Sequence, residues 1–175
     1  MTVRRRVGVV CVLLVALTGC GEKADAPAKA PPKPKTPPEE IIIDNRDPGF
    51  KVLSGTWGTA DKTDGNGCYG EDFRYLAGDP DEVGRARFTP TVSTRRVYEV
   101  FLYWSADPNR TKDQPVIVHD ADGKDHTYRV NLQEHGNQWF RLGEHVFAPE
   151  GCYIEVSNDT EMGYCNADAV RLVSK

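Results

Sequence analysis

One run of eight residues, 97–104, constrains the fold more than any other segment of the chain. Its sequence, VYEVFLYW, is rich in Val, Tyr and Phe, which pack well in strands and are less suited to helices. Because both alternating faces of the run are apolar, we expect a central strand that is covered on both sides. The run therefore predicts a domain built on β-sheet.

Other short segments of the domain also have the pattern of strands, and no segment shows a convincing helical period. Residues 116–119 and 128–132 flank Asp122-Gly123, a dipeptide typical of hairpin turns. Many short strands separated by Gly, Pro, Asn and Asp clusters predict an all-β fold, either a sandwich or a barrel. The other predicted strands are residues 41–44, 73–76, 86–89, 139–142, 152–156 and 167–173.

Residues 41–175 have the length of one domain and can bury one core. The chain has a formal net charge of −4, and the basic residues of the domain are dispersed, so no nucleic-acid-binding surface is indicated. The sequence has no G-x-S-x-G elbow, no H-E-x-x-H motif, no phosphate loop and no Cys/His protease signature. We therefore predict no catalytic residues and no cofactor.

The N-terminus has the pattern of a secretory signal, predicted to cover residues 1–19. An Arg-rich segment precedes an apolar run at residues 7–17, which is shorter than the roughly 18–20 residues that cross a bilayer. The sequence LTGC, which ends at Cys20, resembles the lipobox of bacterial lipoproteins. The resemblance implies cleavage before Cys20, acylation of Cys20 and a membrane-anchored, exported chain. The alternative is an ordinary signal peptide that contains a cysteine.

Residues 20–40 are predicted to be the lipid anchor and an extended linker. The linker is nearly all Pro, Ala, Lys and Glu, so it cannot bury enough surface to fold. In polyproline II conformation about twenty residues reach roughly 60 Å. Gly21 follows Cys20, and by resemblance to the Gram-negative sorting rule it implies the outer membrane, because an aspartate there commonly retains a lipoprotein in the inner membrane. In a host with another envelope the rule does not apply.

Short fragments spread over residues 41–175 form an ordered set. They are Ile43-Asp44-Asn45, Gly49-Phe50, Gly55-Thr56-Trp57, Tyr69-Gly70, Phe73-Arg74-Tyr75, Tyr98-Glu99-Val100 with Trp104, Asp122-Gly123, QWFRLG at 138–143, Val156-Ser157-Asn158 and ADAVRL at 167–172. Together they resemble the golvesin C-terminal, xanthan-lyase-type carbohydrate-binding-like domain. The resemblance implies a jelly-roll-like antiparallel β-sandwich, usually an accessory module of secreted enzymes or surface proteins. In this chain we expect the module itself, rather than an attached enzyme, to be the functional part that is exported.

Two functions fit this organisation. The first, implied by the resemblance, is a lipid-anchored, non-catalytic surface module that binds an extracellular or envelope polysaccharide. The second is a structural module of the envelope that docks another protein and binds no sugar. A β-sandwich hosts both functions, so the sequence does not separate them. A polysaccharide lyase or hydrolase is disfavoured, because any pairing of two carboxylates from an acidic surface would be arbitrary.

Aromatic residues are the candidates for sugar stacking. Trp57, Trp104 and Trp139 fall on recurrent positions of the family, so the resemblance favours buried structural roles, above all for Trp57 and Trp104. Phe101 and Tyr103 lie on the opposite face of their strand from Trp104 and are ligand-binding candidates, as is Trp139. Alternation alone does not show which face of the strand is solvated, so the sequence does not locate the binding site.

Asp168 lies between two alanines in the last predicted strand. An unpaired buried charge is costly, so we expect a structural carboxyl that accepts hydrogen bonds from loop amides rather than an acid catalyst.

His119 and His126 flank the predicted hairpin turn. If the turn at Asp122-Gly123 has no bulge, the two histidines lie directly opposite each other and form half of a metal site. The sequence specifies no third ligand, so we predict no metal and treat both as ordinary polar residues of a hairpin.

Three cysteines remain after the signal and the anchor, and an exported protein can form disulfides. If residues 152–156 and 165–172 form a hairpin, Cys165 lies far from Cys152. We therefore expect a Cys68–Cys165 disulfide and a free Cys152 in the core.

Overall fold

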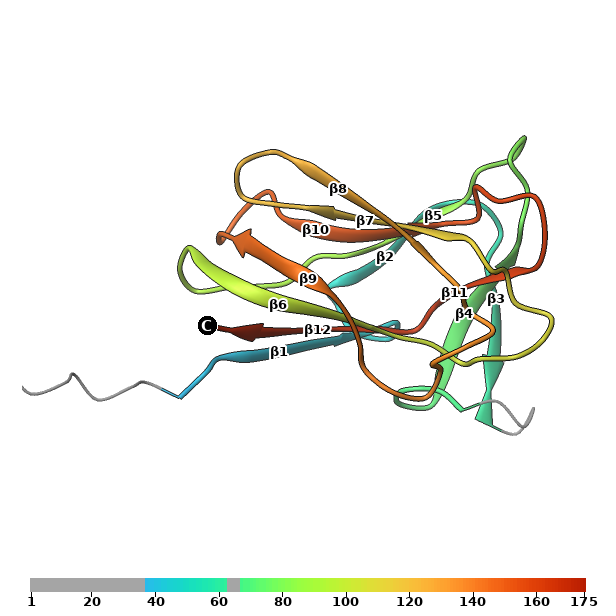
Figure 1. The fold of residues 1–175 in the computed structure, drawn as a ribbon, viewed down its shortest axis with the longest axis horizontal. Coiled ribbons are helices and arrows are strands. Elements are labelled where there is room, and N and C mark those ends of the chain that lie inside the picture. Colours follow the sequence, from blue (N-terminus) through green and yellow to red (C-terminus); the bar gives the residue numbers. More distant parts are fainter. Residues whose placement is uncertain (1–36, 63–66) are drawn as a thin grey trace, which may run out of the picture. The chain divides into compact units, whose positions relative to one another are not determined.

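The computed structural model describes residues 37–62 and 67–175 (Figure 1). The predicted signal peptide, Cys20 and nearly all of the predicted linker lie outside the described residues. Within the described ranges the chain forms twelve strands and no α-helix, which confirms the all-β prediction. This part of the chain accordingly has no helix with the length and hydropathy of a membrane span.

The strands form three sheets, and all pairings between them are antiparallel. Sheet A has the order β1 (Glu40–Asp44), β12 (Ala169–Ser174), β6 (Arg96–Tyr103) and β9 (Phe140–Phe147). Sheet B has the order β2 (Phe50–Ser54), β5 (Arg85–Phe88), β10 (Tyr153–Ser157), β7 (Gln114–His119) and β8 (Asp125–Val130). Sheet C has the order β11 (Tyr164–Ala167), β4 (Asp72–Ala77) and β3 (Gly58–Asp61).

Sheets A and B lie one above the other in Figure 1 and share one core. In β6, Tyr98, Val100 and Leu102 are buried, whereas the intervening Phe101 and Tyr103 are half-buried on the other face. The prediction that β6 is covered on both sides is therefore wrong, because its outer face stays partly open. The antiparallel β-sandwich is confirmed. Sheet B contributes Ala86, Phe88, Val116, Val118, Val130, Ile154 and Val156 to the core.

Buried amide side chains join sheet C to sheet B. Asn158, which follows β10, accepts a hydrogen bond from the N–H of Gly84 (2.7 Å) and donates one to the carbonyl of Ala77 in β4 (2.7 Å). Gln114 of β7 makes two hydrogen bonds with the backbone of Asn166 in β11, at 2.8 and 2.7 Å. Because a buried amide without partners costs about 1–3 kcal/mol, these bonds fix how the two sheets meet.

The sequence patterns missed β2 and β3. Both are edge strands, and neither has the buried face that produces clear alternation. The single strand predicted at residues 167–173 is divided between β11 and β12. β10 pairs with β5 and β7, so the assumed hairpin between β10 and the last strands is wrong.

Candidate functional site

The outer face of sheet A carries aromatic side chains because β6 alternates between the core and the solvent. Tyr103 lies opposite Ala169 of β12, and Phe101 lies opposite Arg171. Ala169 has only a methyl side chain, so it leaves room beside Tyr103 for rings that come from loops. The candidates Phe101 and Tyr103 therefore lie on the face that is open to a ligand.

Two loop residues complete an aromatic cluster, which we define as Tyr69, Tyr103 and Trp139. The ring centroids of Tyr69 lie 5.7 Å from Tyr103 and 5.1 Å from Trp139, and the rings of Tyr103 and Trp139 are 5.3 Å apart. These separations are those of favourable tilted and edge-to-face pairs. All three side chains are half-buried, so the rings support one another and keep part of their surface in solvent.

Arg171 adds a cation to the aromatic cluster. Its guanidinium carbon lies 5.8 Å from the centroid of the Trp139 ring and 5.4 Å from that of Phe101. Both distances are within the range of cation–π attraction. Arg171 also forms an ion pair with Glu40 at 2.6 Å, which leaves the guanidinium tied to β1 as well as to the rings.

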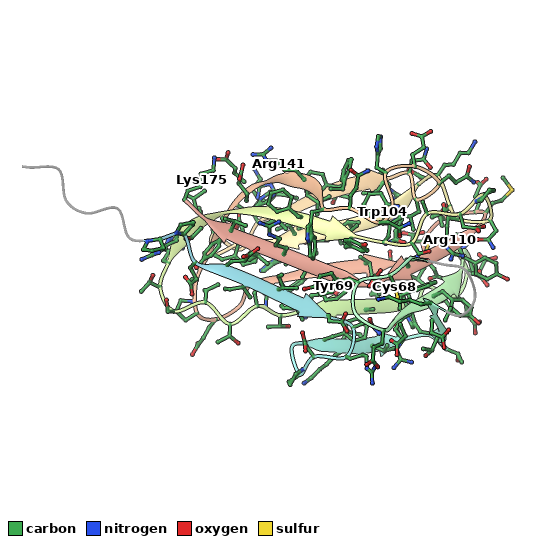
Figure 2. All side chains as sticks on the ribbon, turned by 90° about the horizontal axis from the view of Figure 1, so that it is seen from below. Cys68, Tyr69, Trp104, Arg110, Arg141 and Lys175 are labelled. Atoms are coloured by element: carbon green, nitrogen blue, oxygen red, sulfur yellow. The ribbon has the colours of Figure 1, made fainter. Side chains whose placement is uncertain are left out.

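Asp168 fixes the loop that carries Tyr69, which is labelled in Figure 2. The backbone N–H of Tyr69 lies 3.2 Å from both carboxyl oxygens of Asp168, whose side chain is 1% exposed. The carbonyl of Asp168 accepts a further hydrogen bond from the N–H of Asn45, at 2.8 Å. A loop amide thus bonds to a buried carboxyl, and through it the ring of Tyr69 is held against sheet A.

Burial raises the pKa of Asp168 from 3.8 to about 8, the hydrogen bond from Tyr69 offsets part of this rise, and Asp44 and Asp72 add to it. Asp168 is therefore mostly protonated at neutral pH. Burial, with smaller effects of Asp168 and Cys68, also raises the pKa of Tyr103, so its phenol stays neutral. The aromatic cluster thus lies over a neutral carboxyl. Half-exposed Tyr and Trp rings can bury an apolar ligand surface and offer hydrogen bonds at their polar edges.

The sequence profile of the golvesin C-terminal domain matches residues 41–174. The chain belongs to this family. The match covers the three sheets and every residue of the aromatic cluster.

Two relatives of this golvesin domain are xanthan lyases. The xanthan lyase of Bacillus sp. (strain GL1) is 32% identical over 163 residues, which cover 88% of this chain and 16% of the lyase. The structure of Paenibacillus xanthan lyase matches with a TM-score of 0.70 and 34% identity, over 78% of this chain and 13% of the lyase chain. The chain therefore spans about a sixth of the length of the curated relative, and the similarity concerns one segment of it.

The three tryptophans of the golvesin domain occupy different environments. Trp104 is 1% exposed, packs on Phe140 and donates its indole N–H to the carbonyl of Glu134 at 3.1 Å. Trp57 is half-buried against the core and donates to the carbonyl of Ser54 at 3.0 Å. Trp139 lies in the aromatic cluster instead.

Cys68, Cys152 and Cys165 are all free and buried, so the expected Cys68–Cys165 disulfide is wrong. Cys165 of β11 lies opposite Leu76 near the end of β4, whereas Cys68 lies in the segment that precedes β4. A disulfide requires α-carbons about 4.4–6.8 Å apart. Burial instead raises the pKa of the Cys165 thiol to about 12.

The predicted pairing of His119 with His126 is also wrong. His119 lies opposite Asp125, and His126 lies opposite Val118. The hairpin has a three-residue loop, closed by the Asp120 N–H to Lys124 carbonyl bond, in which Gly123 has a φ of 73°. The slip of one residue puts the two imidazoles on opposite faces of the sheet.

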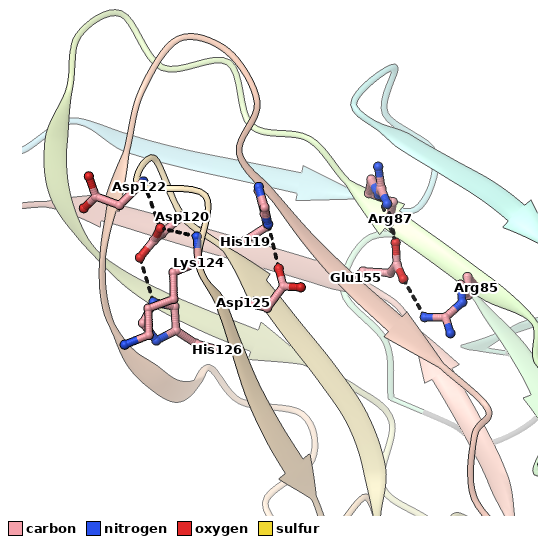
Figure 3. Close-up of polar contacts among 9 residues, drawn as sticks. All are labelled: Arg85, Arg87, His119, Asp120, Asp122, Lys124, Asp125, His126 and Glu155. Carbon is pink, nitrogen blue, oxygen red and sulfur yellow. Dashed lines mark hydrogen bonds and ion pairs between the residues drawn. The ribbon is translucent and has the colours of Figure 1, made fainter.

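Each histidine has its own carboxylate (Figure 3). His119 Nδ1 lies 2.6 Å from Asp125, and His126 Nε2 lies 2.7 Å from Asp120. Although burial raises it, the pKa of Asp120 is lowered to about 2 by hydrogen bonds from His126 and from the N–H groups of Lys124 and Asp122. Among the described residues, no three His, Cys, Asp or Glu side chains are grouped in a way that could hold a metal ion.

Sequence reasoning did not select Tyr69 or Arg171 as site residues. Both belong to fragments that carry the family resemblance, at Tyr69-Gly70 and within residues 167–172. Their meeting with Tyr103 and Trp139 depends on loop contacts between distant segments, for which a sequence period contains no signal. The structure therefore adds both of them to the candidate site.

Proposed function

We propose that residues 41–175 form a non-catalytic polysaccharide-binding module whose contact surface is the aromatic cluster together with Arg171. The observation that carries the proposal is the meeting of Tyr69, Tyr103 and Trp139 on the outer face of sheet A. Kinship supports it, because the relatives are xanthan lyases and the chain matches only a small segment of them.

The cluster suits a sugar for a physical reason. One face of a pyranose ring is lined with C–H groups that pack on an aromatic ring, while its hydroxyls need hydrogen-bond partners. Tyr103 and Trp139 offer both kinds of contact, and Arg171 adds donors beside them. Since neighbouring rings and Asp168 already hold the cluster in place, little conformational freedom is lost when a sugar binds.

The N-terminal segment supports a second part of the proposal. We propose that Cys20 is acylated, that the module is exported and anchored in the outer membrane, and that the Pro-rich linker holds it away from the lipid. The support is the LTGC sequence before Gly21 and the composition of residues 21–40.

Affinity electrophoresis of the full chain through gels that contain xanthan or dextran tests the binding function. Trp139→Ala is expected to weaken binding about 5- to 150-fold, if a sugar ring on Trp139 contributes the roughly 1–3 kcal/mol that a nucleic-acid base contributes by stacking on an aromatic side chain. Tyr164→Ala is the matched control, because Tyr164 is a partly exposed aromatic residue of sheet C outside the cluster. Equal retention of both variants would reject the cluster as the contact surface.

Two further measurements test the remaining parts. Incubation of the purified chain with xanthan should release no unsaturated or reducing ends, and turnover would contradict the non-catalytic role. Cys20→Ser should move the protein from the outer-membrane fraction to the soluble fraction. Recovery of the unchanged protein in the inner membrane would contradict the localisation.

A further inference from the structure

The outer face of sheet B holds a buried carboxylate between two arginines (Figure 3). Glu155 of β10 is 5% exposed, although it lies on the face of the sheet opposite the core. Arg85 donates from Nη1 to one carboxylate oxygen at 2.9 Å, and Arg87 donates to the other from Nη2 at 2.6 Å and from Nε at 3.0 Å. The two guanidiniums, which we call the arginine pair, cover the carboxylate.

The arginine pair leaves an excess of positive charge. One carboxylate balances only one of the two guanidiniums, and Lys51 of β2 lies directly opposite Arg87 and adds a third cation. This patch stands out in a chain whose net charge is −4. A local charge opposite in sign to that of the whole protein favours an anionic partner at that face.

Arg87 is held from two sides. Besides its bonds to Glu155, its guanidinium lies 3.7 Å from the centroid of the Tyr153 ring. From the strand on the other side of β10, His119 stacks on Tyr153 at 4.7 Å with an interplanar angle of 5°. Arg87 and Tyr153 therefore fix Glu155, and Glu155 in turn orients Arg85.

Arg85 keeps donors for a ligand. Only its Nη1 is bonded to Glu155, and among the described residues Nε and Nη2 have no hydrogen-bond partner. These two N–H groups share one edge of the guanidinium, the edge that binds both oxygens of a carboxylate side by side. The side chain of Arg85 is 43% exposed, so this edge is accessible.

We propose that the arginine pair and Lys51 form a second subsite, which binds carboxylate groups of an acidic polysaccharide such as a polyuronate. The inference rests on the proposed function and narrows its ligand to polymers that carry carboxylates. Arg85 receives the carboxylate, Arg87 and Glu155 hold Arg85 in place, and Lys51 adds charge.

The test compares binding of the full chain to polygalacturonate and to neutral dextran at increasing salt concentration. Arg85→Gln is expected to weaken binding to polygalacturonate about tenfold and to lower its salt dependence, while binding to dextran stays unchanged. We expect the fold to tolerate this variant, because Arg87 still pairs with Glu155. Arg85→Lys keeps the charge without the two-donor edge and should restore little of the loss. Arg129→Gln is the control, since Arg129 is a similarly exposed arginine of sheet B that is paired with Asp113.

The outcomes separate the subsite from the proposed function. If Arg85→Gln binds polygalacturonate normally while Trp139→Ala does not, the subsite is wrong and the polysaccharide-binding function stands. If the unaltered chain binds neither of these polymers nor xanthan, the proposed function has failed. Tight binding of polyglutamate with the same dependence on Arg85 would identify an acidic polypeptide as the partner and overturn the inference. Full recovery with Arg85→Lys would overturn the two-donor contact.

Discussion

The two outer faces of the sandwich each depend on a buried carboxyl, and the two carboxyls differ in their partners. Beneath the aromatic cluster, Asp168 has one backbone amide and two nearby acids, and its pKa rises to about 8. On sheet B, Glu155 is buried to a similar degree and pairs with Arg85 and Arg87. The partners of a buried carboxyl, rather than its burial, decide what the face above it presents.

The difference gives the two faces complementary chemistry. A neutral carboxyl needs no ion-pair partner, so the rings of the aromatic cluster pack above Asp168, and that face presents aromatic rings with Arg171 beside them. The ion pairs of Glu155 bring arginines to sheet B, so that face presents positive charge. A polymer with carboxylates and sugar rings can use both faces, whereas a neutral glycan can use only the aromatic cluster.

The largest expected effect comes from Asp168→Asn. The folded-state pKa of about 8 exceeds the usual value of 3.8, so between these pH values the folded protein holds a proton that the unfolded chain has lost. The free energy of unfolding therefore falls as pH rises through this window, by up to about 1.4 kcal/mol per pH unit. Asparagine does not titrate, so the variant should match the wild type near pH 4 and be more stable near pH 8.

Urea unfolding at pH 4, 6 and 8 measures the effect. Asp122→Asn is the control, because Asp122 is an exposed carboxylate that pairs with the exposed Arg95. If Asp168→Asn has the same pH dependence as the wild type, Asp168 is charged in the folded protein, and the contrast with Glu155 disappears.

Glu155→Ala should have the next largest effect. It removes the carboxylate between two guanidiniums, which then repel each other, and we expect a loss of about 2 kcal/mol. The loss is smaller than for a fully buried pair because the arginines are 43% and 33% exposed. Glu99→Ala, which removes a partner of Arg141 on sheet A, should cost at most about 1 kcal/mol. If Glu155→Ala and Glu99→Ala lose the same stability in thermal unfolding, the burial of Glu155 adds nothing to the strength of its ion pairs.

Most of the fold could be predicted from the sequence, because strands that line the core alternate or carry turn signals. β6, β7 and the β7–β8 hairpin were found in this way. β2 and β3 were not, since edge strands without a buried face have no period. The hairpin register was wrong by one residue because Asp122-Gly123 also suits a three-residue loop with Gly123 at positive φ.

The candidate site was predictable only in part. Phe101, Tyr103 and Trp139 stood out as aromatic residues, but no pattern shows which face of a strand meets the solvent. Tyr69 reaches the cluster through a bond to a residue 99 positions away, and Arg85 meets Glu155 across 70 positions. Contacts of this kind follow from the tertiary fold and leave no local trace in the sequence.

The smallest expected effect concerns the link between the two sheets. The phenol of Tyr128 in β8 lies 2.7 Å from His145 Nε2 in β9, so this hydrogen bond joins an edge of sheet B to an edge of sheet A. Tyr128→Phe should lower stability by about 1 kcal/mol, the usual net value of such a bond.

Burial, and then the nearby His126, lower the pKa of His145, so the His145 imidazole takes up a proton less readily in the folded protein than in the unfolded chain. The resulting stability is present above pH 6.5 and is lost as pH falls below it. His145→Gln should reduce this acid sensitivity in urea unfolding between pH 7 and 5, whereas His119→Gln on the outer face serves as the control. If the two variants show the same loss of stability between pH 7 and 5, His145 at the joint between the sheets has no larger effect on acid sensitivity than a histidine on the outer face.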